Sequence, residues 1–323
     1  MFSGDQGPEH HFWRIDSPQR EAEFFSAFGP RKFKWAIAML LDMRGVRWNY
    51  EVKNVHRLPR SSKTQYLMTR LGYLIYYAIM ADIVYQSLYQ VFFGKDMHDT
   101  KYPSLRDGNM SLSFIARLSF GMTIYYMMQI IYNILAIIAV GLNISKKEDW
   151  PPCFGKVSDV TTVRYFWGTY WHQTLRRPLS VFPQALVDGL GIRRGTTLSA
   201  YIQLWLAFLI SGLMHAHDTY MFPSPVNMTS EDRRNGSMWF FLLQATAITL
   251  EDFVQWCLKH MGFTFAKPSA IRKLFGYAWV IAVFWFSIPL AGDAHMQTRY
   301  GKEPIFQPSP SAALVGKLLH ALG

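Results

Sequence analysis

Five apolar segments constrain this chain more than any other feature of its sequence. They lie at 66–93, 112–142, 198–222, 237–258 and 275–291. A helix that crosses a bilayer needs about 20 largely apolar residues, and most of these segments meet that length. They predict an all-α fold, a polytopic integral membrane helical bundle with about five spanning helices and additional re-entrant or interfacial helices. We expect the last span to be short and broken near Pro289.

The charge distribution agrees with a lipid bilayer as the main partner. The 323 residues are 50% hydrophobic and only 17% charged, whereas soluble domains have about 25% charged residues. The net charge of +11 comes from lysines and arginines that lie between the apolar segments rather than on one polar module. Nucleic acid is therefore not expected as a partner.

Basic residues are concentrated in alternate connections. They are dense before the first span, in the 145–197 connection and just before the last span, whereas 94–111 and 218–236 carry balanced or slightly acidic charge. Lysine and arginine favour the cytosolic side of a membrane. We therefore expect a multi-pass protein of the endoplasmic reticulum with a cytosolic N-terminus.

No internal repeat or linker divides the chain, so a single domain over 1–323 is predicted, with 1–20 as a flexible cytosolic tail. Residues 21–41 mix apolar and basic side chains, which favours a helix in the membrane interface. The simplest interpretation of 44–55 is a solvated basic loop with a turn at Gly45. The 2 cysteines lack the spacing of a disulfide framework or a cysteine zinc site.

One histidine lies inside an apolar segment. Ser211 and His215 are four residues apart, so on a helix they share one face. His217 points away from His215, which argues against a shared metal site, and no metal is expected. An ionisable residue at membrane depth is functional by default. The competing interpretation is a packed histidine bonded to a neighbouring carbonyl.

A second histidine ends an aromatic cluster at 166–173. Trp167 and Trp171 share a helical face, and His172 lies on the same side as Arg176. We expect Pro178 to stop this short helix, which would be re-entrant from the cytosol. The competing interpretation is an interfacial aromatic belt.

Polar stripes follow two of the spans. They consist of Asp82, Gln86 and Gln90 in the first, and of Gln244, Glu251 and Gln255 with the adjacent Asp252 in the fourth. Both predict a protein-lined, partly wet interior. They are also compatible with a small polytopic transporter, which is the alternative from another functional class.

Both histidine motifs resemble one family. Phe-Trp-x-x-x-Trp-His-Gln at 166–173, followed by Ser-Gly-Leu-Met-His at 211–215, resembles the membrane-bound O-acyltransferase superfamily. The most similar branch is that of the wax-synthase-like enzymes, including fungal ones that acetylate terpenoids and related metabolites. Arg-Gly-Val-Arg-Trp-Asn at 44–49 and Glu-Asp-Phe-Val-Gln at 251–255 look like further segments of this group. The resemblance extends over about 33–290 of this chain.

The resemblance implies a set of site residues. His215 takes the position of the catalytic histidine, and His172 takes that of the second active-site residue. The residues expected to contact the acyl-CoA are Trp167, Trp171, Gln173, Arg176 and Ser211. No cofactor is expected to be bound permanently, because acetyl-CoA or another acyl-CoA is a co-substrate that approaches from the basic cytosolic side.

The sequence departs from the family pattern in two places. Ala216 follows the catalytic-type histidine, where relatives commonly have a glutamate. Relatives also usually carry further membrane helices before the 44–49 segment. Either those helices are dispensable, or this is a shortened form.

The expected function is an acyl-CoA-dependent O-acyltransferase that moves acetyl to a hydroxyl of a hydrophobic, terpenoid-like alcohol. Direct transfer is expected, because neither cysteine lies in a motif. Bulky side chains expected near the site favour a short acyl group: Trp167, Trp171, Trp205, Phe208, Met214, Trp239 and Phe240. A long-chain wax ester synthase remains an alternative. A di-iron hydroxylase or desaturase, which needs around eight histidines in boxes, is remote.

Overall fold

The computed structural model describes residues 7–93, 104–106, 109–221, 230–263, 269–297 and 308–322. Within these ranges every regular element is a helix, and the β-pairing is one isolated bridge between Arg14 and Trp48. The α-helices are α1 (Pro30–Leu41), α2 (Lys63–Phe93), α3 (Met110–Gly141), α4 (Val163–Tyr165), α5 (Arg176–Gly189), α6 (Thr197–Met221), α7 (Ser230–His260), α8 (Ala270–Gln297) and α9 (Ala312–Leu322). The predicted all-helical architecture is confirmed.

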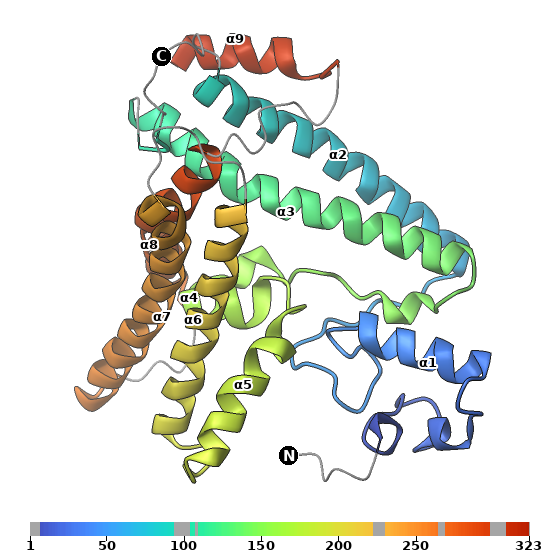
Figure 1. Ribbon diagram of the computed structural model, residues 1–323. Helices are drawn as coiled ribbons and strands as arrows, with labels where there is room; N and C mark the ends of the chain where they lie inside the picture. The colour runs from blue at the N-terminus through green and yellow to red at the C-terminus, as the bar shows by residue number, and fades with distance from the viewer. Residues whose placement is uncertain are drawn as a thin grey trace.

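Two groups of helices make up the bundle (Figure 1). The long helices α2 and α3 pack side by side, and α9 lies against α2. In the second group α7 packs against both α6 and α8, and α5 packs on α6. Contacts between α3 and α8 join the groups. The 142–175 connection, which carries α4, lies between them, so the groups enclose the segment that holds His172.

In the described part of the chain, four helices are long and apolar enough to cross a membrane: α2, α3, α6 and α8. The expected fourth span, 237–258, falls within α7, which has 31 residues. It is less apolar because it carries buried polar side chains such as Gln244 and Glu251. Composition therefore supports four spans rather than five, although α7 has the length of a spanning helix and packs among them.

Helix α8 does not break near Pro289, contrary to expectation. It continues from Ala270 to Gln297 with Pro289 inside it. A proline removes one backbone hydrogen bond, but spanning helices tolerate this where neighbouring structure supports the chain. Pro289 is fully buried, and Gly236 of α7 approaches so closely that a Cβ there would lie 2.1 Å from the carbonyl oxygen of Leu290. The packing of α7 against α8 supports the helix across the proline.

Residues 7–20 do not form a free tail. The amide of Ile15 donates to the carbonyl of Arg47 at 2.8 Å, and Arg14 forms an ion pair with Asp149. From residue 7 onward, the expected flexible segment is therefore packed against the rest of the protein, because its backbone and arginine find partners there. Residues 1–6 lie outside the described residues.

The 44–55 segment is not a solvated loop. Arg44 is 8% exposed and Trp48 is 1% exposed. The Arg44 guanidinium donates to the carbonyl of Pro152 at 2.8 Å and to the hydroxyl of Tyr132 at 2.7 Å. Because these partners replace water, the arginine can be buried, and the segment is joined to the connection that leads to the site.

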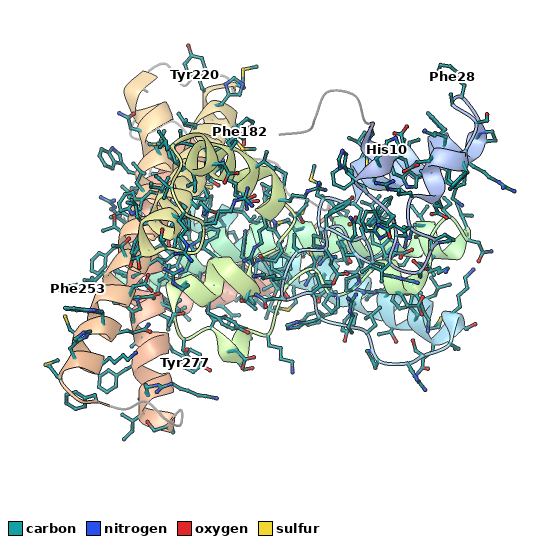
Figure 2. The ribbon with its side chains drawn as sticks, turned by 90° about the horizontal axis from the view of Figure 1, so that it is seen from below. His10, Phe28, Phe182, Tyr220, Phe253 and Tyr277 are labelled. Carbon is teal, nitrogen blue, oxygen red and sulfur yellow. The ribbon has the colours of Figure 1, made fainter. Side chains whose placement is uncertain are left out.

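Large apolar side chains cover the outside of the protein. Phe182 is 70% exposed and Phe253 is 58% exposed, and Figure 2 shows both at the edge of the bundle. Helix α1 buries Trp35 but exposes Leu40 and Leu41, as a helix in the membrane interface would. An apolar surface of this extent, together with the four apolar helices, identifies an integral membrane protein. Most of the expected lumenal loop at 94–111 lies outside the described residues, and so does 222–229 of the loop expected at 218–236. Residues 218–221 and 230–236 of that second loop are helical, as parts of α6 and α7.

The polar stripe of α2 holds the C-terminal helix rather than lining a wet interior. The carboxylate of Asp82 accepts from the hydroxyl of Ser309 at 2.8 Å and from the amide of Ser311 at 2.9 Å. The amide of Gln90 donates to the carbonyl of Ala312 at 2.8 Å. These bonds fix the start of α9 and explain why polar residues occur in an apolar helix.

Candidate active site

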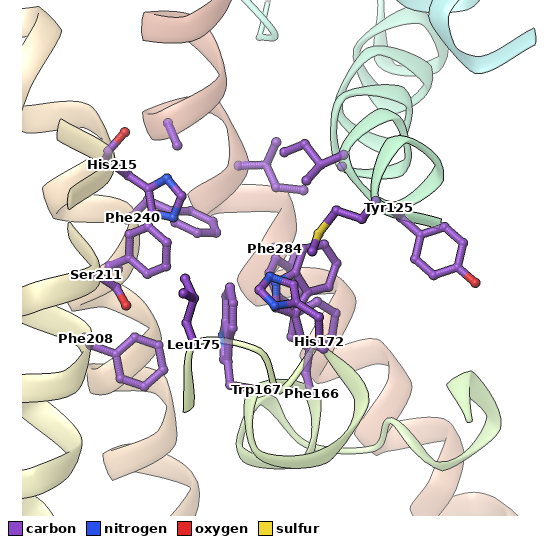
Figure 3. A pocket seen from close by; sticks show the side chains of 18 of the residues that line it. Tyr125, Phe166, Trp167, His172, Leu175, Phe208, Ser211, His215, Phe240 and Phe284 are labelled. Atoms are coloured by element: carbon purple, nitrogen blue, oxygen red, sulfur yellow. The ribbon is translucent and has the colours of Figure 1, made fainter. Parts of the chain in front are cut away.

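A cavity of about 1080 Å³ lies between the 163–175 segment and helices α6, α7 and α8, and it extends to α2 and α3. Its wall is mostly apolar and aromatic. All seven expected site residues line it: Trp167, Trp171, His172, Gln173, Arg176, Ser211 and His215. Figure 3 shows His215 and Ser211 entering from one wall and His172 from another, with Trp167 and Leu175 between them. Two motifs that are far apart in the sequence therefore face one pocket.

The aromatic cluster does not form the regular helix that was expected. After α4, residues Phe166–Tyr170 make a π-helical turn, closed by a 2.7 Å bond from the amide of Trp171 to the carbonyl of Phe166. Trp171 is extended, with ψ of 147°. Such turns are rare and frequently occur at functional sites. The turn keeps the rings of Trp167 and Trp171 on one side, with centroids 6.0 Å apart.

Pro178 does not stop this segment, contrary to expectation. It lies in the first turn of α5, which begins at Arg176. The first helical turn has no intrahelical partner for its amides, so a proline is tolerated there. The segment ends earlier, at the extended residue Trp171.

The polar stripe of α7 holds this segment in place. The Glu251 carboxylate is 8% exposed and accepts from the amide of Val163 at 2.5 Å and from that of Arg164 at 3.0 Å. It also accepts from the indole of Trp279 at 2.7 Å. A carboxylate suits this position because the first amides of a helix are unpaired and carry positive partial charge.

Gln244 adds a second anchor, and Gln255 does not contribute. The side-chain oxygen of Gln244 accepts from the indole of Trp167 at 3.2 Å, and its nitrogen donates to the hydroxyl of Ser287 at 3.0 Å. Gln244 is fully buried, whereas Gln255 is exposed. The expected polar stripe therefore extends only from Gln244 to Glu251 and serves to position the aromatic cluster.

Gln173 and Arg176 brace the same segment from its other end. The amide nitrogen of Gln173 donates to the carbonyls of Trp167 at 3.1 Å and Trp171 at 2.6 Å. Arg176 donates to the side-chain oxygen of Gln173 at 2.9 Å and to the carbonyl of Gly168 at 2.7 Å. Both amide hydrogens of Gln173 are therefore used within the motif. Arg176 is exposed as well as lining the cavity, so it lies where the cavity reaches the protein surface.

His172 is a half-buried imidazole. It lies outside the spanning helices, and burial lowers the pKa of its ring to about 4. Its Nδ1 atom is buried and has no hydrogen-bond partner. Buried polar atoms are usually paired, and an unpaired one calls for an explanation such as a missing ligand. Nδ1 of His172 therefore lacks a partner within the protein, on a side chain that lines the cavity.

His215 is oriented by two neighbours. Its ring stacks on Phe241, with centroids 4.9 Å apart and planes 12° apart. Its Nδ1 atom lies 3.6 Å from Oδ2 of Asp218, one turn further along α6. Position 216 has no carboxylate, because Ala216 stands there, but Asp218 places one beside the His215 ring from three residues further along. His217 is exposed and does not line the cavity, so the predicted divergence of the two histidines is observed.

The aromatic lining differs in part from what was expected. Phe208 and Phe240 line the cavity. Trp205, Met214 and Trp239 do not, and they are 38%, 47% and 58% exposed. They lie on the outer faces of α6 and α7. Residues Phe241 and Phe284 line the cavity instead.

Several polar lining residues were missed from the sequence, among them Arg117, Asp218, Ser237 and His295. Asp218 was assigned to a loop, although α6 continues to Met221. Arg117 lies inside the predicted second span, and an arginine within an apolar segment is itself a signal of function. Ser237 carries no such signal. In the described residues, no group of three or more His, Cys, Asp or Glu could hold a metal ion.

Two family profiles match this chain. The profile of the Membrane bound O-acyl transferase family matches residues 150–243, which include both histidine motifs. The profile of the Aspirochlorine biosynthesis protein F C-terminal domain matches residues 62–141, which cover all of α2 and α3. No solved structure gave a significant match.

Curated relatives include fungal biosynthetic proteins. Aspirochlorine biosynthesis protein F of Aspergillus oryzae is 38% identical over 46% of this chain and 60% of its own length. O-Mevalon transferase macI of Penicillium terrestre is 29% identical over 88% of this chain and 68% of its own length. Acetyltransferase ple2 of Rhodocybe pseudopiperita is 31% identical over 84% of this chain and 70% of its own length. The chain thus spans about two thirds of the length of these relatives.

Proposed function

Because this chain belongs to the membrane-bound O-acyltransferase family, we propose that it transfers an acetyl group from acetyl-CoA to a hydroxyl of a terpenoid-like secondary metabolite. One observation supports the proposal most: His215, Ser211 and His172 face a single large apolar cavity inside the helical bundle. Such a cavity suits a hydrophobic alcohol, and the histidines suit proton transfer. The relatives described above are biosynthetic proteins by name, which leaves the transporter alternative without support.

His215 is the general base of the proposed reaction. Its Nδ1 atom faces Asp218, which leaves Nε2 to accept the hydroxyl proton. The alcohol oxygen attacks the thioester carbonyl and forms a tetrahedral oxyanion. When this intermediate collapses, the carbon–sulfur bond breaks and the coenzyme A thiolate takes the proton back from His215. A positioned base of this kind contributes about 10²–10⁴ in rate.

Ser211 and His172 are the proposed donors to the oxyanion. Ser211 shares the cavity-facing side of α6 with His215, and His172 has a buried nitrogen without a partner. Donors that are already in position stabilise the charge as it develops. Gln173 is assigned a positioning role instead, because both its amide hydrogens are bonded within the motif. Trp167 and Trp171 form the wall against which the acyl-CoA binds, and Arg176 attracts its anionic part at the mouth.

A long-chain wax ester synthase is a second candidate, which the size of the cavity favours. A volume of about 1080 Å³ exceeds what an acetyl group needs. In the leading proposal the remaining space receives the acceptor, whose flat rings would lie against Phe208, Phe240 and Phe284.

A competition assay distinguishes the two candidates. Purified protein is given drimenol, a bicyclic terpenoid alcohol, with equal concentrations of acetyl-CoA and palmitoyl-CoA. We expect the acetyl ester to exceed the palmitoyl ester by at least about tenfold, because an acyl group that does not fit the pocket loses favourable contacts. A parallel reaction with hexadecanol and palmitoyl-CoA is the comparison. Preferential formation of the palmitoyl wax ester would replace the acetyltransferase proposal with that of a wax synthase.

The proposed orientation places the N-terminus and the mouth at Arg176 in the cytosol, in the endoplasmic reticulum membrane. The alternation of basic connections supports it. The test uses a variant without Cys153 and Cys257 into which single cysteines are introduced at exposed positions. We expect Lys156→Cys and Lys259→Cys to react with a membrane-impermeant maleimide in sealed microsomes, and Arg106→Cys to react only after detergent. The reverse pattern would invert the orientation.

A further inference from the structure

Arg117 lies in the membrane-spanning helix α3 and lines the cavity, yet the proposed reaction gives it no role. It is 9% exposed. Its Nε and Nη1 atoms are buried and have no hydrogen-bond partner. Its guanidinium stacks on the ring of Trp285, whose centroid lies 3.8 Å from the guanidinium carbon. An unpaired charge at this depth costs free energy and marks a functional site by default.

The carboxylate of Asp293, in the neighbouring helix α8, already has hydrogen-bond partners. Asp293 of α8 accepts from the hydroxyl of Ser104 and from the amide of Leu105 at 2.7 Å. No ion pair between Arg117 and an acidic group occurs in the described part of the chain. The guanidinium therefore retains donors that no protein group satisfies, on a side chain that lines the cavity.

The position of Arg117 separates it from the entrance assigned to acyl-CoA. That entrance is formed by the 170–176 segment and α5, whereas Arg117 lies among residues of α2, α3 and α8 such as Leu88, Phe120 and Ile288. Figure 1 shows the N-terminal half of α3 at the opposite end of the bundle from α5. A ligand group that reaches Arg117 therefore belongs to the part of the cavity left for the acceptor.

We propose that the acceptor of this enzyme is a hydroxy acid whose carboxylate binds Arg117, while its hydroxyl lies at His215. This inference rests on the proposed function and adds the chemical class of the acceptor. A guanidinium presents a planar fork of donors that matches a carboxylate. The apolar wall around it suits a hydrocarbon skeleton. Ser237 lines the same cavity and has a buried hydroxyl without a partner, so it adds a second polar residue to this wall.

Ligand binding tests this proposal without requiring turnover. The probes are ω-hydroxydecanoate, its methyl ester and ω-hydroxydecyl phosphate, and the readout is the ligand-induced rise in melting temperature of the purified chain in detergent. The wild type and His215→Ala should both be stabilised by the hydroxy acid more than by the ester. A stronger, Arg117-dependent effect of the phosphate would assign the site to a phosphate and overturn the carboxylate. Equal effects of acid and ester would overturn the anion site altogether.

Variants at Arg117 give the second measurement. Arg117→Met should lower affinity for the hydroxy acid about 10- to 100-fold, the usual effect of losing hydrogen bonds to a charged group, and leave affinity for the ester within about twofold. Arg117→Lys should recover part of the loss. Arg106→Gln removes a nearby exposed positive charge that does not line the cavity, and should change neither.

The Arg117 variants also distinguish a role of Arg117 in ligand binding from a role in the stability of the fold. Because Arg117→Met removes an unpaired buried charge, the ligand-free variant should be at least as stable as the wild type. Loss of stability with no change in the acid-to-ester ratio would show that Arg117 only supports packing against Trp285. If no alcohol is acetylated but the acid still binds through Arg117, the proposed function fails and the anion site stands.

Discussion

Replacing His215 by alanine is expected to lower kcat by about 10²–10⁴-fold, the contribution of a positioned general base. Without the imidazole, the site lacks the base that takes the hydroxyl proton as the alcohol attacks. The protein should still fold and insert, because the His215 side chain is 44% exposed and its removal leaves little buried volume empty. The measurement is kcat with saturating acetyl-CoA, alongside the melting temperature of the purified variant. Turnover near that of the wild type would exclude His215 as the base.

Variants of two neighbouring residues show how specific this effect is. His217→Ala is the matched control, because His217 lies on the same helix but is exposed and outside the cavity, and its turnover should be unchanged. His172→Ala should lower kcat strongly through the loss of a donor, and His172→Asn, which keeps a side-chain donor, should recover part of it.

The pH profile separates the two site histidines. With a pKa of about 4, His172 stays neutral down to about pH 5. A loss of kcat/KM on acidification above that pH therefore reports His215, whose protonated ring cannot accept a proton.

Acidification also affects folding. The unfolded chain binds a proton at His172 near the ordinary histidine pKa of 6.5, and the folded chain only near about 4, so the free energy of unfolding falls as pH drops through this window. Profiles must therefore be recorded where the melting temperature is constant.

The sequence predicted the elements that depend on local patterns. Apolar length alone identified the positions of α2, α3, α6, α7 and α8. The spacing of Ser211 and His215 placed both on one face, and the structure has both lining the same cavity. These predictions succeeded because helix periodicity and bilayer thickness act within a single segment.

Features set by distant partners could not be predicted in this way. The π-helical turn at Phe166–Tyr170 is held by Glu251 and Gln244 from another helix. Arg44 is buried because carbonyls more than 100 residues away accept its hydrogen bonds. For Arg44 the residue type indicates solvent, and only the folded chain supplies the partners that replace water.

Asp218 illustrates the difficulty at the site itself. It falls in both the predicted span at 198–222 and the predicted connection at 218–236, and it is counted with the charges of that connection. Because α6 extends to Met221, a residue three positions after His215 lies beside it on the helix. Counting Asp218 with the connection rather than with the helix therefore hid a partner of the proposed base.

Replacing Glu251 by leucine is expected to have the largest effect on stability. The change leaves the amides of Val163 and Arg164 and the indole of Trp279 without their acceptor. Each buried donor that loses its partner costs about 1–3 kcal/mol, so a loss of roughly 3 kcal/mol or more is expected once relaxation is allowed. The melting temperature in detergent should fall by several degrees. Turnover should be lost as well, because these bonds hold the segment that carries His172.

Asp252→Asn is the matched control for Glu251→Leu. Asp252 is the next residue along α7 and forms an ion pair with Arg164, but the two side chains are 29% and 50% exposed. Exposed ion pairs contribute at most about 1 kcal/mol, so this variant should keep most of its stability and turnover. Glu251→Gln retains one acceptor oxygen and should lie between the two. If Glu251→Leu were as stable and active as Asp252→Asn, the carboxylate would not be what positions the aromatic segment, and the π-helical turn would have to be maintained by the bonds of Gln173 and Gln244 alone.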